Sequence, residues 1–558
     1  MLDAPQDDLK EKIAKLHREG EERAAERLAE KLGLTYVDLA KIPVSLDAVR
    51  IVPEAEAKEA KVAVIELKAN KIALAAIDPT LPAAKKVSDE LTGKNYEVKT
   101  VVVSPSSMEA AWHYYQFIKP EEATITGKVN ITQERLDSLK AKLTTIDAVH
   151  DEIASLPLEN VSPVALIEVI LAGAMGLRTS DIHTEAGEKT AKIRFRVDGL
   201  LHDIFDDLPL GSYRTFVDRI KLLSEMKLNV RDAAQDGRFT IGLGARDIEM
   251  RVAIIPSEFG ETIVMRILDP AATMVTLPQL GLRADNLALV KKKIAQPNGL
   301  ILNTGPTGSG KTTTLYAFLR TMNDPTMKII TLEDPIEYRI EGIEQTQINE
   351  EAGYTFGNGL RAIVRQDPDV ILVGEVRDLE TADIALEAAL TGHLVLSTLH
   401  TNDAVGAVPR LINLGVKAVS IGPALSLAIA QRLVRVLCPD CKKQTDVDAA
   451  TAENIKKLLD SLPAKVDRKP YDNYKVYAPV GCPKCNGIGY KGRVGVFEFL
   501  EGGPDLETTI LREASEVSLR EVAARQEMVT MQRDGILKVL EGKTTFDEVV
   551  TATGDLMW

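Results

Sequence analysis

The sequence predicts an α/β protein whose C-terminal half is built on a doubly wound parallel sheet. From residue 271 to residue 558, apolar strand-like runs alternate with helix-like segments. One run, residues 300–302, opens into a glycine-rich loop that continues into a helix-prone segment. Two further apolar runs end in carboxylates, and in such sheets ligands bind at the carboxyl edge of the strands. A ligand site is therefore expected at that edge.

A small α/β domain is expected over residues 1–115. A helical period over residues 21–32 ends at Gly33, a residue type that favours the end of a helix. Two alternating apolar runs, residues 62–67 and 72–77, flank a short polar segment and predict a β-hairpin.

Residues 116–155 are polar and charged with a weak helical pattern, which predicts a linker. A second domain is expected over residues 156–270. Within it, residues 192–197 and 200–205 alternate around an Asp-Gly pair, the strongest short signal for a hairpin. The third domain covers residues 271–558.

Length and composition limit the class of protein. A chain of 558 residues with 45% hydrophobic and 27% charged residues is a globular protein of several domains. A net charge of −14 argues against nucleic acid as the main partner, since phosphate binding needs a cationic face. The acidic N-terminus predicts no signal peptide, and no run reaches about 18 apolar residues. We expect a soluble, cytoplasmic chain that does not insert into a membrane.

The glycine-rich loop fits the pattern of a phosphate-binding loop, with strand, loop and helix in the required order. Backbone amides of such a loop surround phosphate oxygens, the lysine reaches the β- and γ-phosphates, and the hydroxyl after it binds Mg²⁺. The sequence therefore predicts that ATP and Mg²⁺ bind here. The predicted nucleotide-binding residues are Gly305, Pro306, Thr307, Gly308, Ser309, Gly310, Lys311, Thr312 and Thr313, with Thr312 as the Mg²⁺ ligand.

Two strand ends supply candidate acids. The run 369–373 leads through Gly374 to Glu375, with glycine where an aspartate usually binds Mg²⁺. The run 329–332 ends in Glu333. Two histidines, His393 and His400, bracket a third apolar run and are further candidates.

All four cysteines of the chain fall into two Cys-x-x-Cys pairs. In a chain expected in the cytosol this spacing predicts a metal site before disulfides. Cys438, Cys441, Cys482 and Cys485 together complete a tetrahedral shell for one structural Zn²⁺. We expect them to close an insertion over residues 438–492.

Taken together, these motifs resemble the secretion-superfamily ATPases that power type IV pilus assembly and type II secretion. The resemblance covers residue 160 to the end and, more loosely, the first domain. It rests on the phosphate loop, the acidic box Thr331-Leu-Glu-Asp-Pro-Ile-Glu337, the glycine-bearing strand before Glu375 and the histidine box ending at His400. Ser180-Asp-Ile-His183 and Gln235-Asp-Gly-Arg238 add to it. Asn303, just before the loop, departs from the aliphatic residue expected there.

The resemblance implies a RecA-like ATPase domain, a PAS-like second domain and a small first domain. Glu333 would polarise the attacking water, Glu375 would organise Mg²⁺, and His393 and His400 would sense the γ-phosphate. The family works as a homohexamer on an inner-membrane platform protein, at the inner face of the cytoplasmic membrane. Its zinc insertion is typical of assembly and secretion motors. Arginines of the second domain would reach a neighbouring site, and the candidates are Arg194, Arg196, Arg238, Arg251 and Arg266. Arg361 and Arg365 share one face of a predicted helix and are further candidates for phosphate contact.

Two other functions compete with an assembly motor. A nucleic-acid-translocating ring ATPase would share the phosphate loop, but the acidic charge and 4% aromatic residues disfavour it. A regulatory nucleotide-binding module without turnover is disfavoured by the presence of Lys311 and Glu333. The sequence leaves open which fibre or secretion system is driven, which arginines act across subunits, and whether the first domain binds a cyclic dinucleotide.

Overall fold

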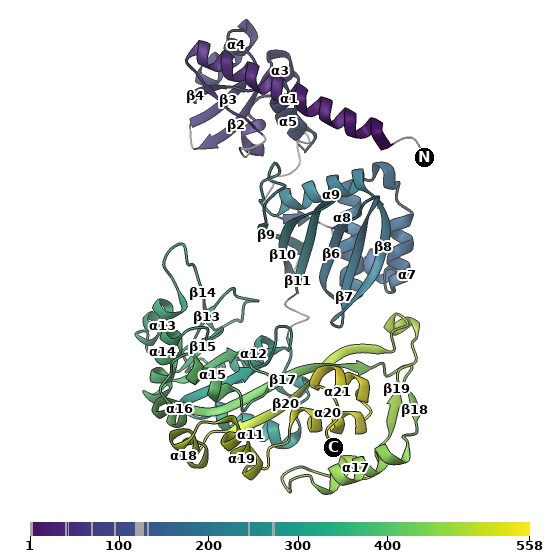
Figure 1. Ribbon diagram of the computed structural model, residues 1–558, viewed down its shortest axis with the longest axis vertical. Helices are drawn as coiled ribbons and strands as arrows, with labels where there is room; N and C mark the ends of the chain where they lie inside the picture. Colours follow the sequence, from purple (N-terminus) through teal and green to yellow (C-terminus); the bar gives the residue numbers. More distant parts are fainter. Residues whose placement is uncertain are drawn as a thin grey trace. The chain divides into compact units, whose positions relative to one another are not determined.

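The computed structural model describes residues 4–558 except 40, 41, 43, 69–70, 94–95, 118–127, 131–132, 244–245 and 270–273. It divides into two compact units, residues 1–267 and 268–558 (Figure 1). None of the helices within these described ranges is long and apolar enough to cross a membrane.

The N-terminal unit begins with a four-stranded sheet of order β1-β4-β3-β2. Strands β2 and β3 pair antiparallel, which confirms the expected hairpin. Val64 and Leu74, opposite each other in that pair, are buried in the core beside this sheet. The elements are α1 (Ala4–Leu32), β1 (Thr35–Tyr36), α2 (Leu46–Val49), α3 (Glu54–Ala60), β2 (Val62–Lys68), β3 (Lys71–Ala76), α4 (Pro82–Gly93), β4 (Glu97–Val102), α5 (Pro105–Trp112) and η1 (His113–Phe117).

The same unit continues with a seven-stranded sheet of order β5-β9-β10-β11-β6-β7-β8. The expected hairpin is β7–β8, and its turn residues Asp198 and Gly199 have φ angles of 48° and 95°. Both angles are positive, as a two-residue type I′ turn requires. The elements are β5 (Lys128–Asn130), α6 (Gln133–Lys142), α7 (Ile146–Ala154), η2 (Leu158–Asn160), α8 (Pro163–Gly176), β6 (Thr179–Ala186), β7 (Thr190–Val197), β8 (Leu200–Pro209), α9 (Leu210–Leu223), β9 (Gln235–Leu243), β10 (Arg246–Ser257) and β11 (Gly260–Leu268).

The expectation of a linker over residues 116–155 is corrected by helices α6 and α7. Leu136, Leu139 and Leu143 lie at i, i+3 and i+7, and all three are buried in the core below the seven-stranded sheet. Val149 and Ile153 of α7 join the same core. Each helix has only one narrow apolar face among many charged residues, so its composition resembles that of a linker. The spacing of its apolar residues, however, is that of a helix packed on a core.

The C-terminal unit contains a second seven-stranded sheet, of order β14-β13-β15-β16-β12-β17-β20. All neighbours are parallel except β17 and β20, which confirms the predicted fold class. Successive residues of β12 are buried in different hydrophobic cores, because Ile301 packs on one face of the sheet and Leu302 on the other. Burial on both faces explains the continuous apolar runs in the sequence.

The elements of this unit are η3 (Leu277–Leu280), α11 (Ala284–Ile294), β12 (Gly299–Thr304), α12 (Lys311–Met322), β13 (Ile329–Glu333), β14 (Glu344–Gln347), α13 (Phe356–Val364), β15 (Val370–Val373), α14 (Leu379–Leu390), β16 (Leu394–Leu399), α15 (Ala407–Asn413), α16 (Ala418–Ala424), β17 (Leu425–Leu437), β18 (Lys443–Thr445), α17 (Ala449–Asp460), η4 (Lys469–Tyr471), β19 (Val476–Ala478), η5 (Pro483–Cys485), β20 (Tyr490–Glu501), α18 (Pro504–Arg512), α19 (Glu516–Arg525), α20 (Met531–Leu540) and α21 (Phe546–Thr553).

The segment between β17 and β20 packs against the C-terminal helices. Ile455 and Leu458 of α17 share a core with Ile536 and Leu540 of α20.

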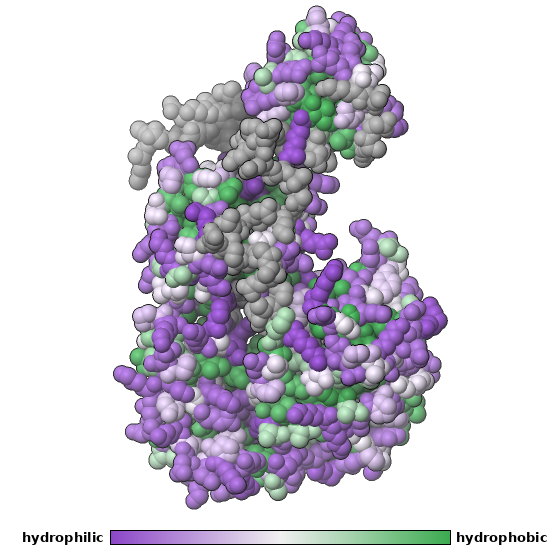
Figure 2. Space-filling view, turned by 180° about the vertical axis from the view of Figure 1, so that it is seen from behind, coloured by the Kyte–Doolittle hydropathy of each residue, from purple (hydrophilic) through white to green (hydrophobic). Residues whose placement is uncertain are grey.

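On the face drawn in Figure 2, hydrophobic side chains of the C-terminal unit show in small groups between hydrophilic ones.

Candidate nucleotide site and cysteine cluster

The glycine-rich loop connects β12 to α12 at the carboxyl edge of the sheet, as predicted. Gly305 and Gly310 have φ angles of 150° and 86°. A Cβ on Gly305 would lie 2.6 Å from the carbonyl oxygen of Gln431, and one on Gly310 would lie 2.8 Å from its Nε2 atom. The loop therefore needs glycine at both positions because the neighbouring strand β17 lies so close. No side chain caps the first turn of α12, so its amides are available to an anion.

Lys311 arches back over this loop. Its Nζ donates hydrogen bonds to the carbonyl oxygens of Gly305, at 2.8 Å, and Pro306, at 3.1 Å. Burial lowers the pKa of the ammonium; the positive charge of Arg432 lowers it further, and the charge of Glu375 opposes this. Thr312 follows, exposed at the helix start. This arrangement fits a triphosphate and its Mg²⁺: an amide-lined turn, a cation above it and an exposed hydroxyl.

Glu333 is the last residue of β13 and is 3% exposed. Thr331 Oγ1 donates to its Oε1 at 2.6 Å, Gln345 Nε2 donates to the same oxygen at 3.2 Å, and the Tyr316 hydroxyl donates to Oε2. Burial raises the pKa of Glu333, and these three donors limit the rise because they stabilise the charged form. The structure thus gives this carboxylate a fixed orientation and an environment suited to proton transfer.

Glu375 lies beyond the end of the neighbouring strand β15. Its Oε1 accepts a hydrogen bond from Arg377, and its Oε2 is 3.6 Å from Nε2 of His400. Burial lowers the pKa of His400; the cations of Lys311 and Arg377 act in the same direction, and Glu375 opposes them. Charges from the ends of β15 and β16 and from the phosphate loop therefore meet at one place.

Gly374 allows strands β13 and β15 to end close together. Its N–H donates to the carbonyl oxygen of Leu332 at 2.8 Å, and a Cβ there would lie 3.3 Å from that oxygen and 3.4 Å from Cα of Glu333. A glycine in place of the usual aspartate thus allows the two strand ends that carry Glu333 and Glu375 to pack closely together.

Hydrogen bonds from two strands, β12 and β20, hold the segment after His400 in place. Thr401 N–H donates to Oγ1 of Thr304 at 2.8 Å, and the two threonine hydroxyls lie 2.7 Å apart. Ala404 N–H donates to Oε1 of the buried Glu498, whose Oε2 accepts from the N–H of Met531. One carboxylate of β20 therefore ties this segment to the first residue of α20.

His393 does not reach this site within the chain. It precedes β16 and its Nδ1 lies 3.0 Å from the carbonyl oxygen of Ala388, whereas His400 follows the same strand. At about 3.3 Å per residue, the two histidines are on the order of 20 Å apart. The expectation that both histidines sense the γ-phosphate is corrected for His393 within its own chain, because the two ends of a strand lie at opposite edges of the sheet.

Arg361 and Arg365 also lie away from the phosphate loop of their own chain. Arg361 pairs with Glu380 of α14, and Arg365 is exposed at the end of α13. Helix α13 runs back toward the amino end of β15, so its last turn faces the opposite edge of the sheet. Contact of these two arginines with phosphate in the same chain is therefore not supported.

The five arginine candidates of the N-terminal unit lie on the outer face of its seven-stranded sheet. Each has at least one buried apolar neighbour in its strand, so its own side chain points away from the core. Four contact carboxylates: Arg194 pairs with Glu185, Arg196 and Arg266 share Asp181, and Arg251 lies 3.5 Å from Glu249 of its own strand. The strand registers set which candidates are neighbours: Arg238 faces Arg251, Arg266 faces Asp181, and Asp181 faces Arg196.

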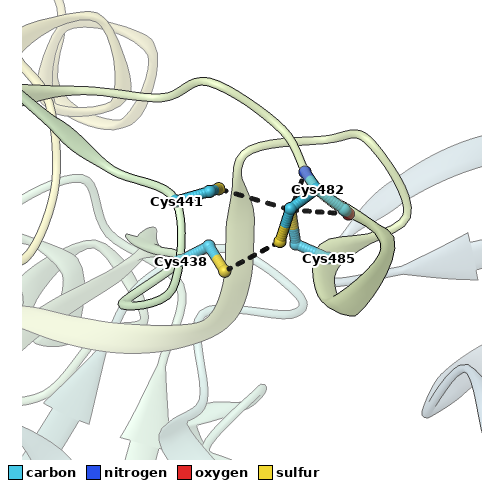
Figure 3. Close-up of side chains that lie close together, drawn as sticks. All are labelled: Cys438, Cys441, Cys482 and Cys485. Carbon is cyan, nitrogen blue, oxygen red and sulfur yellow. Dashed lines mark hydrogen bonds between the residues drawn. The ribbon is translucent and has the colours of Figure 1, made fainter.

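The four cysteines lie together as predicted (Figure 3). Their sulfur atoms lie within 4.8 Å of one another, with Cys438–Cys482 at 3.9 Å, Cys441–Cys485 at 3.8 Å and Cys482–Cys485 at 3.7 Å. Zn–S bonds of about 2.3 Å in a tetrahedron separate the sulfurs by about 3.8 Å. The N–H groups of Cys482 and Gly489 donate to Sγ of Cys485 at 3.2 and 3.3 Å, which stabilises a thiolate. The donor set and spacing fit a Zn²⁺ ion.

Comparison with known proteins decides the family. The model of the family described as type II/IV secretion system protein matches residues 158–551, and the MshEN domain model matches residues 32–119. The chain belongs to the type II/IV secretion system protein family. This confirms the predicted family and fold class, and with the phosphate loop it confirms the prediction of an ATP hydrolase.

Two curated relatives match over most of their length. The type IV pilus assembly ATPase PilB of Myxococcus xanthus is 37% identical over 537 residues, 96% of this chain and 91% of that protein. The type II secretion system ATPase E of Vibrio cholerae is 42% identical over 473 residues, 81% of this chain and 91% of that protein. The ATPase DotB of Legionella pneumophila shares the fold, with a TM-score of 0.52 and 24% identity over 70% of this chain and 96% of that one. The alternative of a nucleic-acid translocase gains no support from these relatives.

Arg377, Thr304 and Glu498 are not among the residues that the sequence predicted for the site. Arg377 carried a signal, because it lies two residues after the candidate acid Glu375. Thr304 and Glu498 act on the segment after His400 from 97 and 94 residues away in sequence. No local pattern marks such a partner.

Proposed function

We propose that this ATPase is the motor of a pilus-assembly or type II secretion machine. It would work as a homohexamer at the cytoplasmic face of the inner membrane, coupled to a platform protein there. The observation that carries the proposal is the convergence of Lys311, Glu375 and His400 at one sheet edge, in a chain whose relatives are assembly and secretion ATPases.

The proposed roles follow the geometry. Lys311 neutralises charge on the β- and γ-phosphates, and Thr312 binds Mg²⁺. Glu333, buried and held by three donors, orients and polarises the attacking water. Glu375 organises the metal, and His400, beside it, responds to the γ-phosphate.

The proposed ring places arginines of the second domain on a neighbouring nucleotide. Arg238 and Arg251 are preferred among the five candidates because they face each other across β9 and β10. Like charges directly opposite in a sheet repel, and an anion between them would relieve the repulsion. Arg194, Arg196 and Arg266 pair with carboxylates of neighbouring strands, whereas the carboxylate that Arg251 contacts, Glu249, lies two residues before it on the same strand.

The proposed protein has three domains, and each is formed by its own stretch of the chain. Residues 1–115 form the first domain, and residues 156–270, extended by α6 and α7, form the second. Residues 271–558 hydrolyse ATP, and Zn²⁺ at the four cysteines closes the insertion 438–492. A structural Zn²⁺ contributes folding energy and no chemistry there.

Steady-state ATPase measurements on Lys311→Ala test the proposal. Removing the ammonium should lower Mg²⁺-dependent turnover by about 10²-fold or more. Lys457→Ala, an exposed lysine of the insertion, is the matched control and should hydrolyse normally. Normal turnover in Lys311→Ala would contradict the proposed site. Stimulation of turnover by added DNA would favour a translocase instead.

A further inference from the structure

Arg432 lies at the phosphate loop although it is 121 residues beyond Lys311 in sequence. Strand β17 runs beside β12, with Ala430 opposite Thr304, so Arg432 follows just past the end of β12. A Cβ built on Gly305 would lie 3.1 Å from Nη1 of Arg432. The guanidinium group therefore lies directly against the first residue of the loop.

The guanidinium of Arg432 donates its hydrogen bonds to neutral acceptors. Nη1 donates to its neighbour's carbonyl oxygen, that of Gln431, at 3.2 Å. Nη2 donates to the carbonyl oxygen of Asn402 at 3.2 Å and to its Oδ1 at 3.5 Å. Among the residues that the structure describes, Arg432 forms no ion pair within 4 Å.

The acidic groups whose charges act on Arg432 are engaged elsewhere. Burial lowers the pKa of Arg432, and the charges of Glu498 and Asp403 oppose this. Glu498 accepts from two backbone N–H groups, and Asp403 pairs with Arg520. Lys311 in turn donates to two carbonyl oxygens of the loop. Two cations thus share one end of the loop, an arrangement that a polyanion stabilises.

We propose that Arg432 binds a γ-phosphate oxygen of the ATP held by the loop of the same chain. Nη1 faces the loop, and Nη2 stays on Asn402, which directly follows Thr401, the residue that is hydrogen-bonded to Thr304. One side chain would then join the terminal phosphate to the segment that Glu498 ties to α20. The inference rests on the proposed function, because it requires that ATP is the nucleotide of this loop.

A competing explanation is that Arg432 only holds the segment at Asn402 in place. The two explanations differ in one respect: a structural bridge needs hydrogen-bond donors, whereas a γ-phosphate contact needs the charge as well. Arg432→Gln keeps an amide that donates to carbonyl oxygens and removes the charge. Arg432→Lys keeps the charge and loses the forked geometry.

The experiment measures the affinity of full-length protein for a non-hydrolysable ATP analogue and for ADP, both with Mg²⁺, by competition with a fluorescent nucleotide. A charge-assisted hydrogen bond contributes enough binding free energy that Arg432→Gln should weaken binding of the ATP analogue by about tenfold or more. ADP affinity should change little, and Arg432→Lys should recover part of the loss. Arg525→Ala, which removes an exposed arginine paired with Asp505, should leave both affinities unchanged.

Equal losses for both nucleotides, or no loss in Arg432→Gln, would overturn the inference. Lys311→Ala, measured in parallel, separates it from the proposed function. Suppose that Lys311→Ala loses affinity for the ATP analogue, while Arg432→Gln keeps the wild-type ratio of the two affinities, for the ATP analogue and for ADP. Then only the proposed role of Arg432 is wrong. If Lys311→Ala also binds normally, the proposed nucleotide site itself fails.

Discussion

Tyr316 and Glu333 are joined by a hydrogen bond between the helix that follows the phosphate loop and the end of β13. The tyrosine hydroxyl donates to Oε2, while Oε1 is occupied by Thr331 and Gln345. Helix α12 begins at Lys311, so the residue proposed to face phosphate and the proposed base are fixed through one rigid element. The bond makes the proton affinity of Glu333 sensitive to Tyr316.

Glu333→Gln should abolish hydrolysis while ATP binding survives. The amide keeps the shape of the side chain and removes the base, so turnover should fall by about 10²-fold or more. Single-turnover hydrolysis and equilibrium ATP binding measure the two properties separately. Glu341→Gln, an exposed acid in the turn before β14, is the control. Should Glu333→Gln hydrolyse normally while Glu375→Gln is inactive, the two proposed roles are reversed.

Tyr316→Phe should move the acid limb of the ATPase pH profile toward higher pH. Burial already raises the pKa of Glu333, and loss of a donor to its charged form raises it further. Because the ionised carboxylate is the active form, more alkaline conditions are then needed to populate it. Tyr354→Phe, whose hydroxyl bonds to Thr346, should leave the profile in place. An unchanged acid limb in Tyr316→Phe would mean that Glu333 does not set it.

Mixed rings test whether Arg238 acts on a neighbouring subunit. Lys311→Ala and Arg238→Ala should each be inactive alone, and mixing them should restore some activity, because some interfaces then hold both intact residues. Turnover is measured against the mixing ratio. Arg214→Ala, an exposed arginine of α9, should be active without mixing. A fully active dilute monomer would exclude the ring.

Cys485→Ser should release the metal and loosen residues 438–492. Wild-type protein is expected to contain about one zinc per chain. Because binding energy of the metal is folding energy of the insertion, limited proteolysis should cut the variant there while ATP binding persists. Lys484→Ala removes only an exposed pair with Asp440, so zinc content should be retained. Absence of zinc from the wild type, with four freely titrating thiols, would refute the site.

Local signals in the sequence predicted the features of the fold and of the site that local backbone geometry builds. The phosphate loop, the Asp198-Gly199 turn and the strand-end carboxylates each follow from a few consecutive residues. The cysteine pairs were found because zinc ligands have a distinctive spacing. The two ends of β16 show the limit: His393 and His400 look equivalent in sequence, but strand direction separates them.

Contacts made at long range could not be predicted. Asn303 illustrates this, because its polar side chain is fully buried next to the loop. Its Nδ2 donates to Oε1 of Gln431 at 3.0 Å, and that oxygen also accepts from Thr314 at 2.8 Å. Part of the cost of burying this amide is therefore offset by a partner 128 residues away, which no local pattern reveals.

The packing of α6 and α7 sets where a working fragment of this protein has to begin. A truncation that starts at residue 156 would remove five buried side chains, Leu136, Leu139, Leu143, Val149 and Ile153, from the domain it is meant to isolate. Removing one large buried aliphatic side chain typically costs about 2–5 kcal/mol. Such a fragment would expose apolar surface and aggregate, and its inactivity would say nothing about the first domain. Biochemical dissection should instead start upstream of β5.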